Sequence, residues 1–223
     1  MEQIIKTLIY THAFFGGIGL ITGIISILVR KGGINHKNTG KAFSYSMVIS
    51  SVISLFVARM PGHENLFLFL IGIFTIYLVL AGNRALTLKD KSKTKADWFD
   101  KSISGAMLLA SIVMLVIGVL GQIQHNTNSI LFTFFGAIGI FMTLKDFQTF
   151  KTFTRKKHAW LISHLGRMIA ALIASFTAFL VAGLHMSTLM IWIMPTLIGT
   201  AYIVYWNRKF KTSEKTSVLK PGL

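Results

Sequence analysis

The chain has 223 residues, of which 53% are hydrophobic and only 13% are charged, and its mean hydropathy is +0.64. Soluble domains carry about 25% charged residues, so this composition argues against an ordinary soluble protein. Lys and Arg number 23 against 7 Asp and Glu, which gives a net charge of +16. The absence of cysteine excludes disulfides, thiolate catalysis, iron–sulfur clusters and cysteine-ligated zinc.

Seven apolar stretches follow one another along the chain, each close to the length of about 20 residues that a helix needs to cross a bilayer. The predicted spans are 8–29, 43–60, 66–82, 103–121, 129–144, 159–183 and 189–206. The first is too long for the apolar part of a signal peptide, and no small-x-small cleavage site follows it. The sequence therefore predicts an all-α bundle of seven transmembrane helices over residues 1–206, followed by a basic, disordered tail over 207–223.

The basic residues gather in every second connector. Of the 23, 20 fall in segments 30–42, 84–101, 145–158 and 207–223, whereas the other connectors between spans hold none. Because basic loops stay on the cytoplasmic side, this pattern predicts an inner-membrane protein with its N-terminus outside and its C-terminus in the cytoplasm. The expected partners are the bilayer and its anionic lipid head groups rather than nucleic acid, for which no binding motif is present. The sequence allows a homo-oligomer but does not define one.

Small residues on several predicted helices favour close helix packing in lipid. They recur at spacings of about four: Gly19 and Gly23 in the first helix, Ser46, Ser50 and Ser54 in the second, and Gly166, Ala170, Ala174 and Ala178 in the sixth. Pro195 lies inside the seventh helix, where we expect it to kink the axis. These features predict a packed bundle and do not by themselves indicate a site.

Arg167 is the one polar residue that topology does not explain. It lies eight residues into the sixth predicted helix, about 12 Å below its cytoplasmic boundary, and His164 lies one turn earlier on the same face. All seven acidic residues fall in tails, connectors or helix ends, which argues against a carboxylate-based proton or cation transporter. We expect Arg167 to pair with a backbone carbonyl, an outside anion or an acid from a connector, or else to snorkel to the interface.

The histidines form two predicted layers. The cytoplasmic layer holds His36, His158 and His164; the outer layer holds His63, His125 and His185, with His12 about a third of the way down the first helix. These histidines allow two kinds of site: a haem b bound between His12 and His164, or a metal ion bound by His12 and the outer layer. Hydrogen-bonded histidines at helix ends are the alternative. No ligand spacing motif is present, so no metal site is predicted.

Five motifs together indicate a family. They are Thr11–Gly16, Asn35–Lys41, Trp160–Met168, Ile173–Val181 and Trp192–Thr196. With them the chain resembles, over nearly its whole length, the bacterial membrane family of domain of unknown function 2306, in a form associated with Bacteroidetes. The resemblance implies an integral membrane protein without an assigned activity, substrate or cofactor. It also implies that His12, His36 and His164 belong to the family's motifs.

The leading functional prediction is a membrane protein that binds a small anionic or lipidic ligand at a cytoplasmic-side cluster of His36, Asn83, His164 and Arg167. No P-loop, GxSxG, HExxH or dinucleotide motif indicates an enzyme. One alternative is a haem b-binding membrane oxidoreductase, similar to cytochrome b, with His12 and His164 as axial ligands. The other is a proton-coupled transporter that uses the same two histidines.

Overall fold

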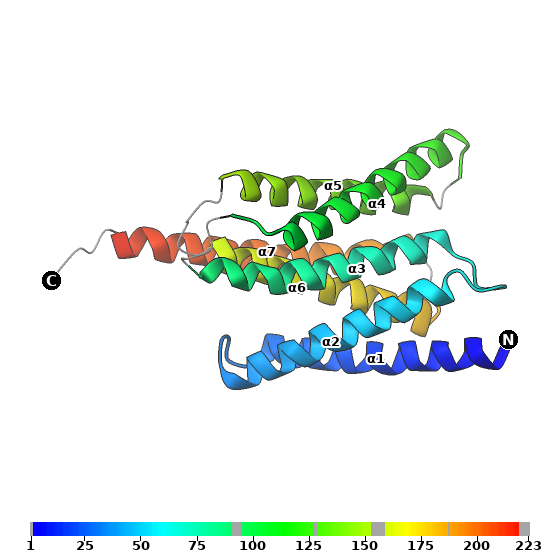
Figure 1. Cartoon of the computed structure of the whole chain (residues 1–223), viewed down its shortest axis with the longest axis horizontal. Coiled ribbons are helices and arrows are strands. Elements are labelled where there is room, and N and C mark those ends of the chain that lie inside the picture. Colours follow the sequence, from blue (N-terminus) through cyan, green and yellow to red (C-terminus); the bar gives the residue numbers. More distant parts are fainter. Residues whose placement is uncertain (1, 91–94, 127–128, 153–158, 187, 219–223) are drawn as a thin grey trace.

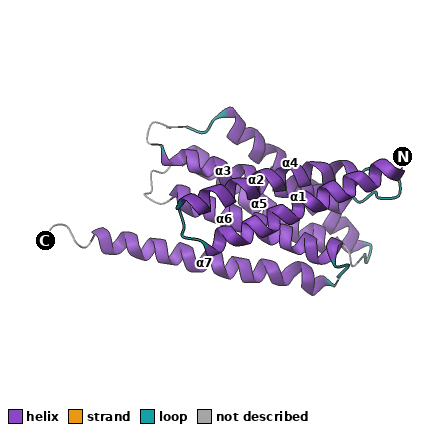
Figure 2. Ribbon diagram, turned by 90° about the horizontal axis from the view of Figure 1, so that it is seen from below, coloured by secondary structure: helices purple, strands orange, loops and turns teal. Residues whose placement is uncertain are grey.

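A computed structural model shows the protein as seven long helices that run alternately in opposite directions (Figure 1). It describes residues 2–90, 95–126, 129–152, 159–186 and 188–218, with the backbone alone in 211–218. The helices are α1 (Glu2–Leu28), α2 (Ile34–Val57), α3 (Leu66–Ala85), α4 (Trp98–Ile123), α5 (Ser129–Thr152), α6 (Ala159–Ala178) and α7 (Leu189–Val218). A 3₁₀ turn, η1 (Leu86–Lys89), prolongs α3, and a π turn, η2 (Phe179–Gly183), prolongs α6. No strand occurs in these described ranges (Figure 2).

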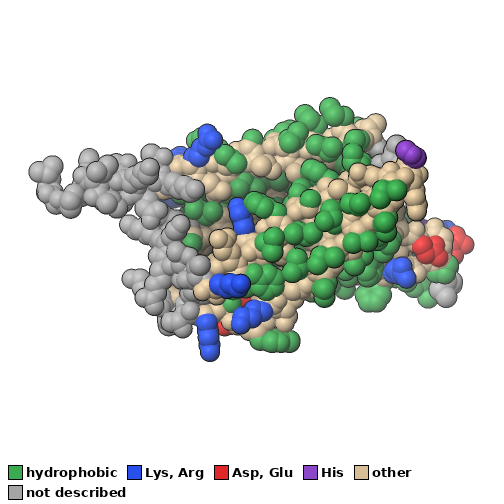
Figure 3. Space-filling view, turned by 90° about the horizontal axis from the view of Figure 1, so that it is seen from above, with side chains coloured by type: hydrophobic (Ala, Val, Ile, Leu, Met, Phe, Trp, Pro, Cys, Tyr) green, Lys and Arg blue, Asp and Glu red, His purple; other side chains and the backbone are tan. Residues whose placement is uncertain are grey.

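All seven helices are long and apolar enough to cross a membrane, which confirms the predicted number and order of the spans. The C-terminal ends of α1, α3, α5 and α7 and the N-terminal ends of α2, α4 and α6 lie at one end of the bundle, and the N-terminal end of α1 lies at the other (Figure 1). We call these the basic end and the opposite end. On the face shown in Figure 3, most Lys and Arg side chains gather toward the basic end, and apolar side chains cover the length of the helices.

Three helices extend furthest beyond the apolar runs from which they were predicted. α2 begins at Ile34 rather than at residue 43, and α5 continues past residue 144 to Thr152. α7 runs to Val218, past residue 207 where the predicted tail begins, and residues 219–223 lie outside the described part. The extra turns are polar, so a hydropathy profile does not count them as part of a span. His36 and Asp146 consequently lie on helices and not in connectors.

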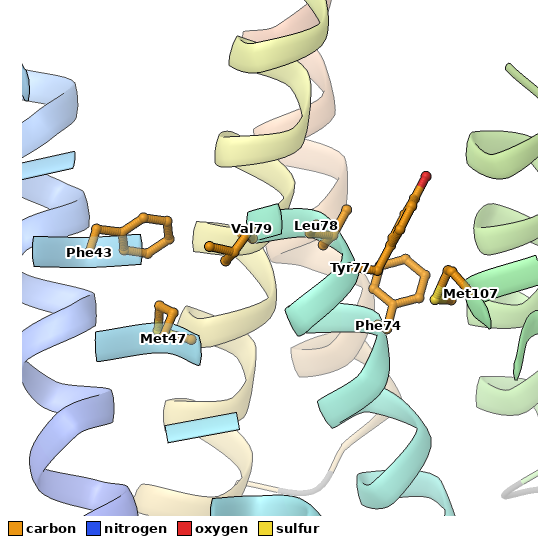
Figure 4. Close-up of a cluster of buried hydrophobic side chains, with 8 residues drawn as sticks. Phe43, Met47, Phe74, Tyr77, Leu78, Val79 and Met107 are labelled. Atoms are coloured by element: carbon orange, nitrogen blue, oxygen red, sulfur yellow. The ribbon is translucent and has the colours of Figure 1, made fainter. Parts of the chain in front are cut away.

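The centre of the bundle is α3, which packs against α2, α4 and α6. Half of its apolar window is buried, compared with 6% of that of α7, which lies at the edge of the bundle (Figure 2). Figure 4 shows Phe43 and Met47 of α2 directed toward Val79 of α3, while Tyr77 of α3 lies beside Met107 of α4. The apolar side chains that stay exposed on the outer helices suit a lipid surface.

Close approach at small residues, as predicted, joins neighbouring helices. A Cβ at Gly19 would lie 2.6 Å from Met47 Sδ, so α1 and α2 touch there. In α6 the pattern is offset: Gly166 faces α7, whereas the fully buried small residue is Ala171. At the α4–α5 contact the neighbouring atom belongs to the backbone and cannot move aside as a side chain can. A Cβ at Gly136 would lie 2.7 Å from the backbone nitrogen of Leu115. These contacts fix the spacing of neighbouring helices.

Gly136→Ala should lower the thermal unfolding temperature of the detergent-purified protein, because only a shift of α4 against α5 makes room for the methyl group. Gly105→Ala in α4 is the matched control, since nothing lies within 4 Å of its Cβ position. There the substitution should be neutral or slightly stabilising, because Ala is the better helix former by about 1 kcal/mol. Equal melting temperatures for the two variants would contradict the close α4–α5 packing.

Candidate functional site

Arg167 lies in the interior of the bundle, where it is only 6% exposed. Its guanidinium donates to the Tyr77 hydroxyl, to the Asp146 carboxylate and, at 3.1 Å, to the carbonyl oxygen of Met142. The other carboxylate oxygen of Asp146 accepts from Tyr77 Oη at 2.6 Å and from Ser104 Oγ at 3.0 Å. We call these five residues the Arg167–Asp146 network. It joins α3, α4, α5 and α6 through one satisfied ion pair.

Of the partners that the sequence allows for Arg167, the structure shows an acidic side chain and a backbone carbonyl. The acidic partner is Asp146, which lies in the segment predicted as a connector. In the structure this segment is helical, because α5 continues beyond the apolar run. The side chain of Asp146 is only 13% exposed. The expectation that every carboxylate stays at the ends of the bundle is therefore wrong for Asp146. Because the pair is neutral, Arg167 does not offer an uncompensated positive charge to a ligand.

A second ion pair lies nearby at the basic end. Arg84 Nε donates to Asp100 at 2.6 Å, and a terminal guanidinium nitrogen of Arg84 donates to Asp97. Asp97 and Asp100 also form a capping box at the start of α4. A pocket of about 40 Å³, enough for a few water molecules, separates the two arginine–carboxylate pairs. Arg84, Asp100 and Asp146 line this pocket, and two arginines and three carboxylates take part in the pairs around it, so it has no excess of positive charge.

The histidines at the basic end bind carbonyl oxygens at the C-terminal ends of helices. His36 Nδ1 lies 3.0 Å from the oxygen of Ser26 in the last turn of α1, and His164 Nδ1 lies 2.8 Å from that of Gly82 in the last turn of α3. Such carbonyls lack a partner within their own helix. Because a carbonyl only accepts, Nδ1 must carry the proton in each ring, and Nε2 is the bare nitrogen of the neutral imidazole.

His36 and His164 belong to one cluster. His36 acts electrostatically on His164. Lys31 Nζ donates to the Ser26 oxygen at 3.0 Å, so the ammonium and the His36 ring meet at the same atom. Asn83, next to Gly82, accepts from Ser44 Oγ at 3.4 Å through Oδ1 and keeps its amide N–H groups as donors. We call Lys31, His36, Asn83 and His164 the basic-end cluster.

The cluster is electrically unbalanced. In the described part of the chain no ion pair is formed by Lys31, and its ammonium donates only to backbone oxygens. Lys31 is exposed at the surface of the protein, and partial desolvation of its ammonium lowers its pKa below the usual value. The negative ends of α1 and α3 favour cations at this position, but a helix terminus carries only about half a unit charge.

The structure thus brings together three of the four predicted ligand-binding residues. His36, Asn83 and His164 lie in the basic-end cluster, whereas Arg167 belongs to the neighbouring network. The sequence missed Lys31, which looked like any other basic connector residue. The turn Arg30–Gly33 directly after α1 was the available signal, because lysines there readily reach the last carbonyls of a helix.

His12 lies apart from this cluster. Its Nδ1 is 2.9 Å from both the carbonyl oxygen and Oγ of Ser50. Ser50 is six residues further along α2 than Ser44, the partner of Asn83, which is about 9 Å along the axis. His12 and His164 therefore lie at different depths. This arrangement does not suit two axial ligands of one haem b.

The outer histidines do not form a metal centre in the part that the structure describes, where no three His, Cys, Asp or Glu side chains converge. His63 Nδ1 lies 3.4 Å from the carbonyl oxygen of Pro61 in the same turn. His125 and His185 adopt left-handed backbone conformations, with φ of 58° and 56°, just after α4 and η2. His158 lies outside the described residues.

Comparisons of the chain with protein-family models, with curated proteins and with solved structures gave no match. The resemblance to the family of domain of unknown function 2306 therefore stays a prediction from sequence motifs. A function has to be argued from the residues of the site.

Arg167→Leu should strongly destabilise the protein, because it leaves Asp146 buried without its counter-ion, a loss of about 3–5 kcal/mol for a typical buried pair. The double variant Arg167→Leu with Asp146→Leu removes both charges and should recover most of that loss. Thermal and denaturant unfolding in detergent measure both effects.

Lys6→Leu is the control for loss of a cation. Lys6 pairs with Glu2 at 2.7 Å, with side chains 64% and 82% exposed, and such surface pairs contribute at most about 1 kcal/mol. If Arg167→Leu proved no more destabilising than Lys6→Leu, the network would not hold the four helices together.

Proposed function

We propose that the protein is a multi-pass inner-membrane protein that binds a small anionic ligand or an anionic lipid head group at the basic-end cluster. One observation carries the proposal. Lys31 and His36 share the Ser26 oxygen, His164 lies within electrostatic reach, and no described carboxylate pairs with Lys31. A cationic group of this kind at the end of an apolar bundle attracts and holds anions.

The surroundings of the cluster favour the same ligand class. Lys37 and Lys41 are exposed on the first turns of α2, and Lys89 Nζ lies 5.6 Å from the centre of the Trp160 ring on the first turn of α6. Asn83 adds neutral N–H donors, which fix the orientation of an oxyanion. The pocket beside Arg84 has a polar lining too, but its paired charges do not distinguish an anion from water.

The orientation in the membrane is part of the proposal. The alternation of basic and non-basic connectors supports an outer N-terminus and a cytoplasmic basic end. The natural absence of cysteine allows a direct test with single-cysteine variants. In intact bacteria a membrane-impermeant maleimide should label His63→Cys at the opposite end, and it should label Asn38→Cys only after permeabilisation. The reverse pattern would overturn the orientation.

Lys31→Met should weaken anion binding about tenfold or more, because a hydrogen bond from a charged donor contributes about 1.5–3 kcal/mol. The measurement is calorimetric titration of inorganic phosphate into protein held in phosphatidylcholine nanodiscs, and the lipid arm exchanges phosphatidylglycerol into the discs. Lys6→Met removes a cation at the opposite end and should bind like the wild type. Equal affinities for the two variants, or no binding by the wild type, would remove the basis of the proposal.

A further inference from the structure

We propose that the basic-end cluster selects a dianionic tetrahedral oxyanion, the chemistry of a phosphate monoester, and binds it together with protons taken up at Nε2 of His36 and His164. The inference rests on the proposed function and adds the charge of the ligand and its coupling to protons. The phosphate can belong to a soluble molecule or to the head group of a phosphatidic acid. The experiment below distinguishes these two sources.

Both histidine rings are held in a fixed orientation. Each Nδ1–H is engaged by a helix carbonyl, at Ser26 for His36 and at Gly82 for His164. In the described part of the chain neither Nε2 has a hydrogen-bond partner. A neutral ring so held presents a lone pair at Nε2 and repels an oxyanion, whereas a protonated ring presents an N–H donor. Anion and proton therefore bind together or not at all at these two nitrogens.

A second feature is the number of charges in the cluster. His36 and His164 act on each other electrostatically, and Lys31 shares the carbonyl of His36. Protonation of both rings without a ligand would place three cations in one cluster, which like-charge repulsion opposes. A dianion offsets two of these charges, and a monoanion offsets only one. The cluster should therefore prefer a dianionic monoester to a monoanionic diester.

A third feature is the set of other charged groups on the elements packed around the cluster. They are Arg30 and Lys31 after α1, Lys37 and Lys41 on α2, Arg84 on α3, Lys89 on η1 and Arg167 on α6, with Asp97, Asp100 and Asp146 in the ion pairs described above. Lys and Arg normally stay charged between about pH 5 and pH 8, where imidazole titrates. Lys31 is the remaining candidate for proton exchange, because partial desolvation lowers its pKa.

The test uses sulfate, a tetrahedral dianion whose charge stays constant over this pH range. Calorimetric titration into full-length protein in phosphatidylcholine nanodiscs, in two buffers of different ionisation enthalpy, reports the protons taken up for each sulfate bound. We expect uptake of between about one and two protons near pH 8, and an affinity that falls about tenfold per pH unit for each proton coupled. Dimethyl phosphate, a monoanionic diester, should bind at least about tenfold more weakly than sulfate.

Asparagine variants separate proton uptake from folding. His36→Asn and His164→Asn keep an N–H near the position of Nδ1, so each helix carbonyl keeps its donor while Nε2 is lost. Each should lower the uptake by about one proton and flatten the pH dependence. His63→Asn, at an exposed histidine of the opposite end, should change neither. Lys31→Met should weaken binding but keep the pH dependence.

The outcomes are distinct. Sulfate binding without proton uptake, or dimethyl phosphate binding as tightly as sulfate, would overturn this inference and leave the proposed anion site standing. Loss of the pH dependence in Lys31→Met or in His63→Asn would overturn the assignment to the two histidines. Absence of any anion binding at every pH would overturn the proposed function and the inference with it. Competition by free phosphate supports a soluble ligand, and competition only by phosphatidic acid in the disc supports a lipid.

Discussion

The guanidinium of Arg167 has to be neutralised inside an apolar bundle, and much of the arrangement of the helices follows from how this is done. A cation at this depth is costly unless a carboxylate and further hydrogen bonds surround it. Asp146 supplies the charge, and Tyr77 and Ser104 fill the remaining acceptor sites of its carboxylate. Four helices contribute to this one pair. The rotation of α6 about its axis is thereby fixed, and His164, one turn earlier, is directed to the Gly82 carbonyl.

The polar groups of the basic end consequently fall into two regions with different electrical character. Between α3, α4, α5 and α6, two arginines pair with three carboxylates, and the pocket between them has no excess of positive charge. Where α1, α2, α3 and α6 meet, Lys31 and two histidines face only backbone and amide groups. Balanced pairs hold helices together, whereas a cluster with excess positive charge is stabilised when an anion binds. The charge of the second region therefore favours an anion, and that of the first does not.

The number of spans could be predicted because apolar runs of sufficient length are separated by polar connectors, a property of the chain alone. The partner of Arg167 could not, because the apolar run ends at residue 144 and Asp146 enters the interior only when α5 continues. That continuation depends on contacts with other helices. His36 was predicted as a site residue, but its place on α2 was not. Lys31 was missed because its role depends on the geometry of a helix end rather than on residue type.

His12, His36 and His164 all use the same device, an Nδ1–H bound to a carbonyl of an adjacent helix. The device by itself is structural, since it joins two helices and fixes the tautomer of the ring. At His12 the Ser50 hydroxyl engages the same nitrogen and donates back to the His12 carbonyl, a closed pair that locks α1 against α2. At His36 and His164 the rings instead lie at the basic end, near Lys31, which forms no ion pair in the described part of the chain. Identical hydrogen bonding thus serves packing at His12, whereas at the basic end we propose that it also orients a ligand site, and the local charge makes the difference.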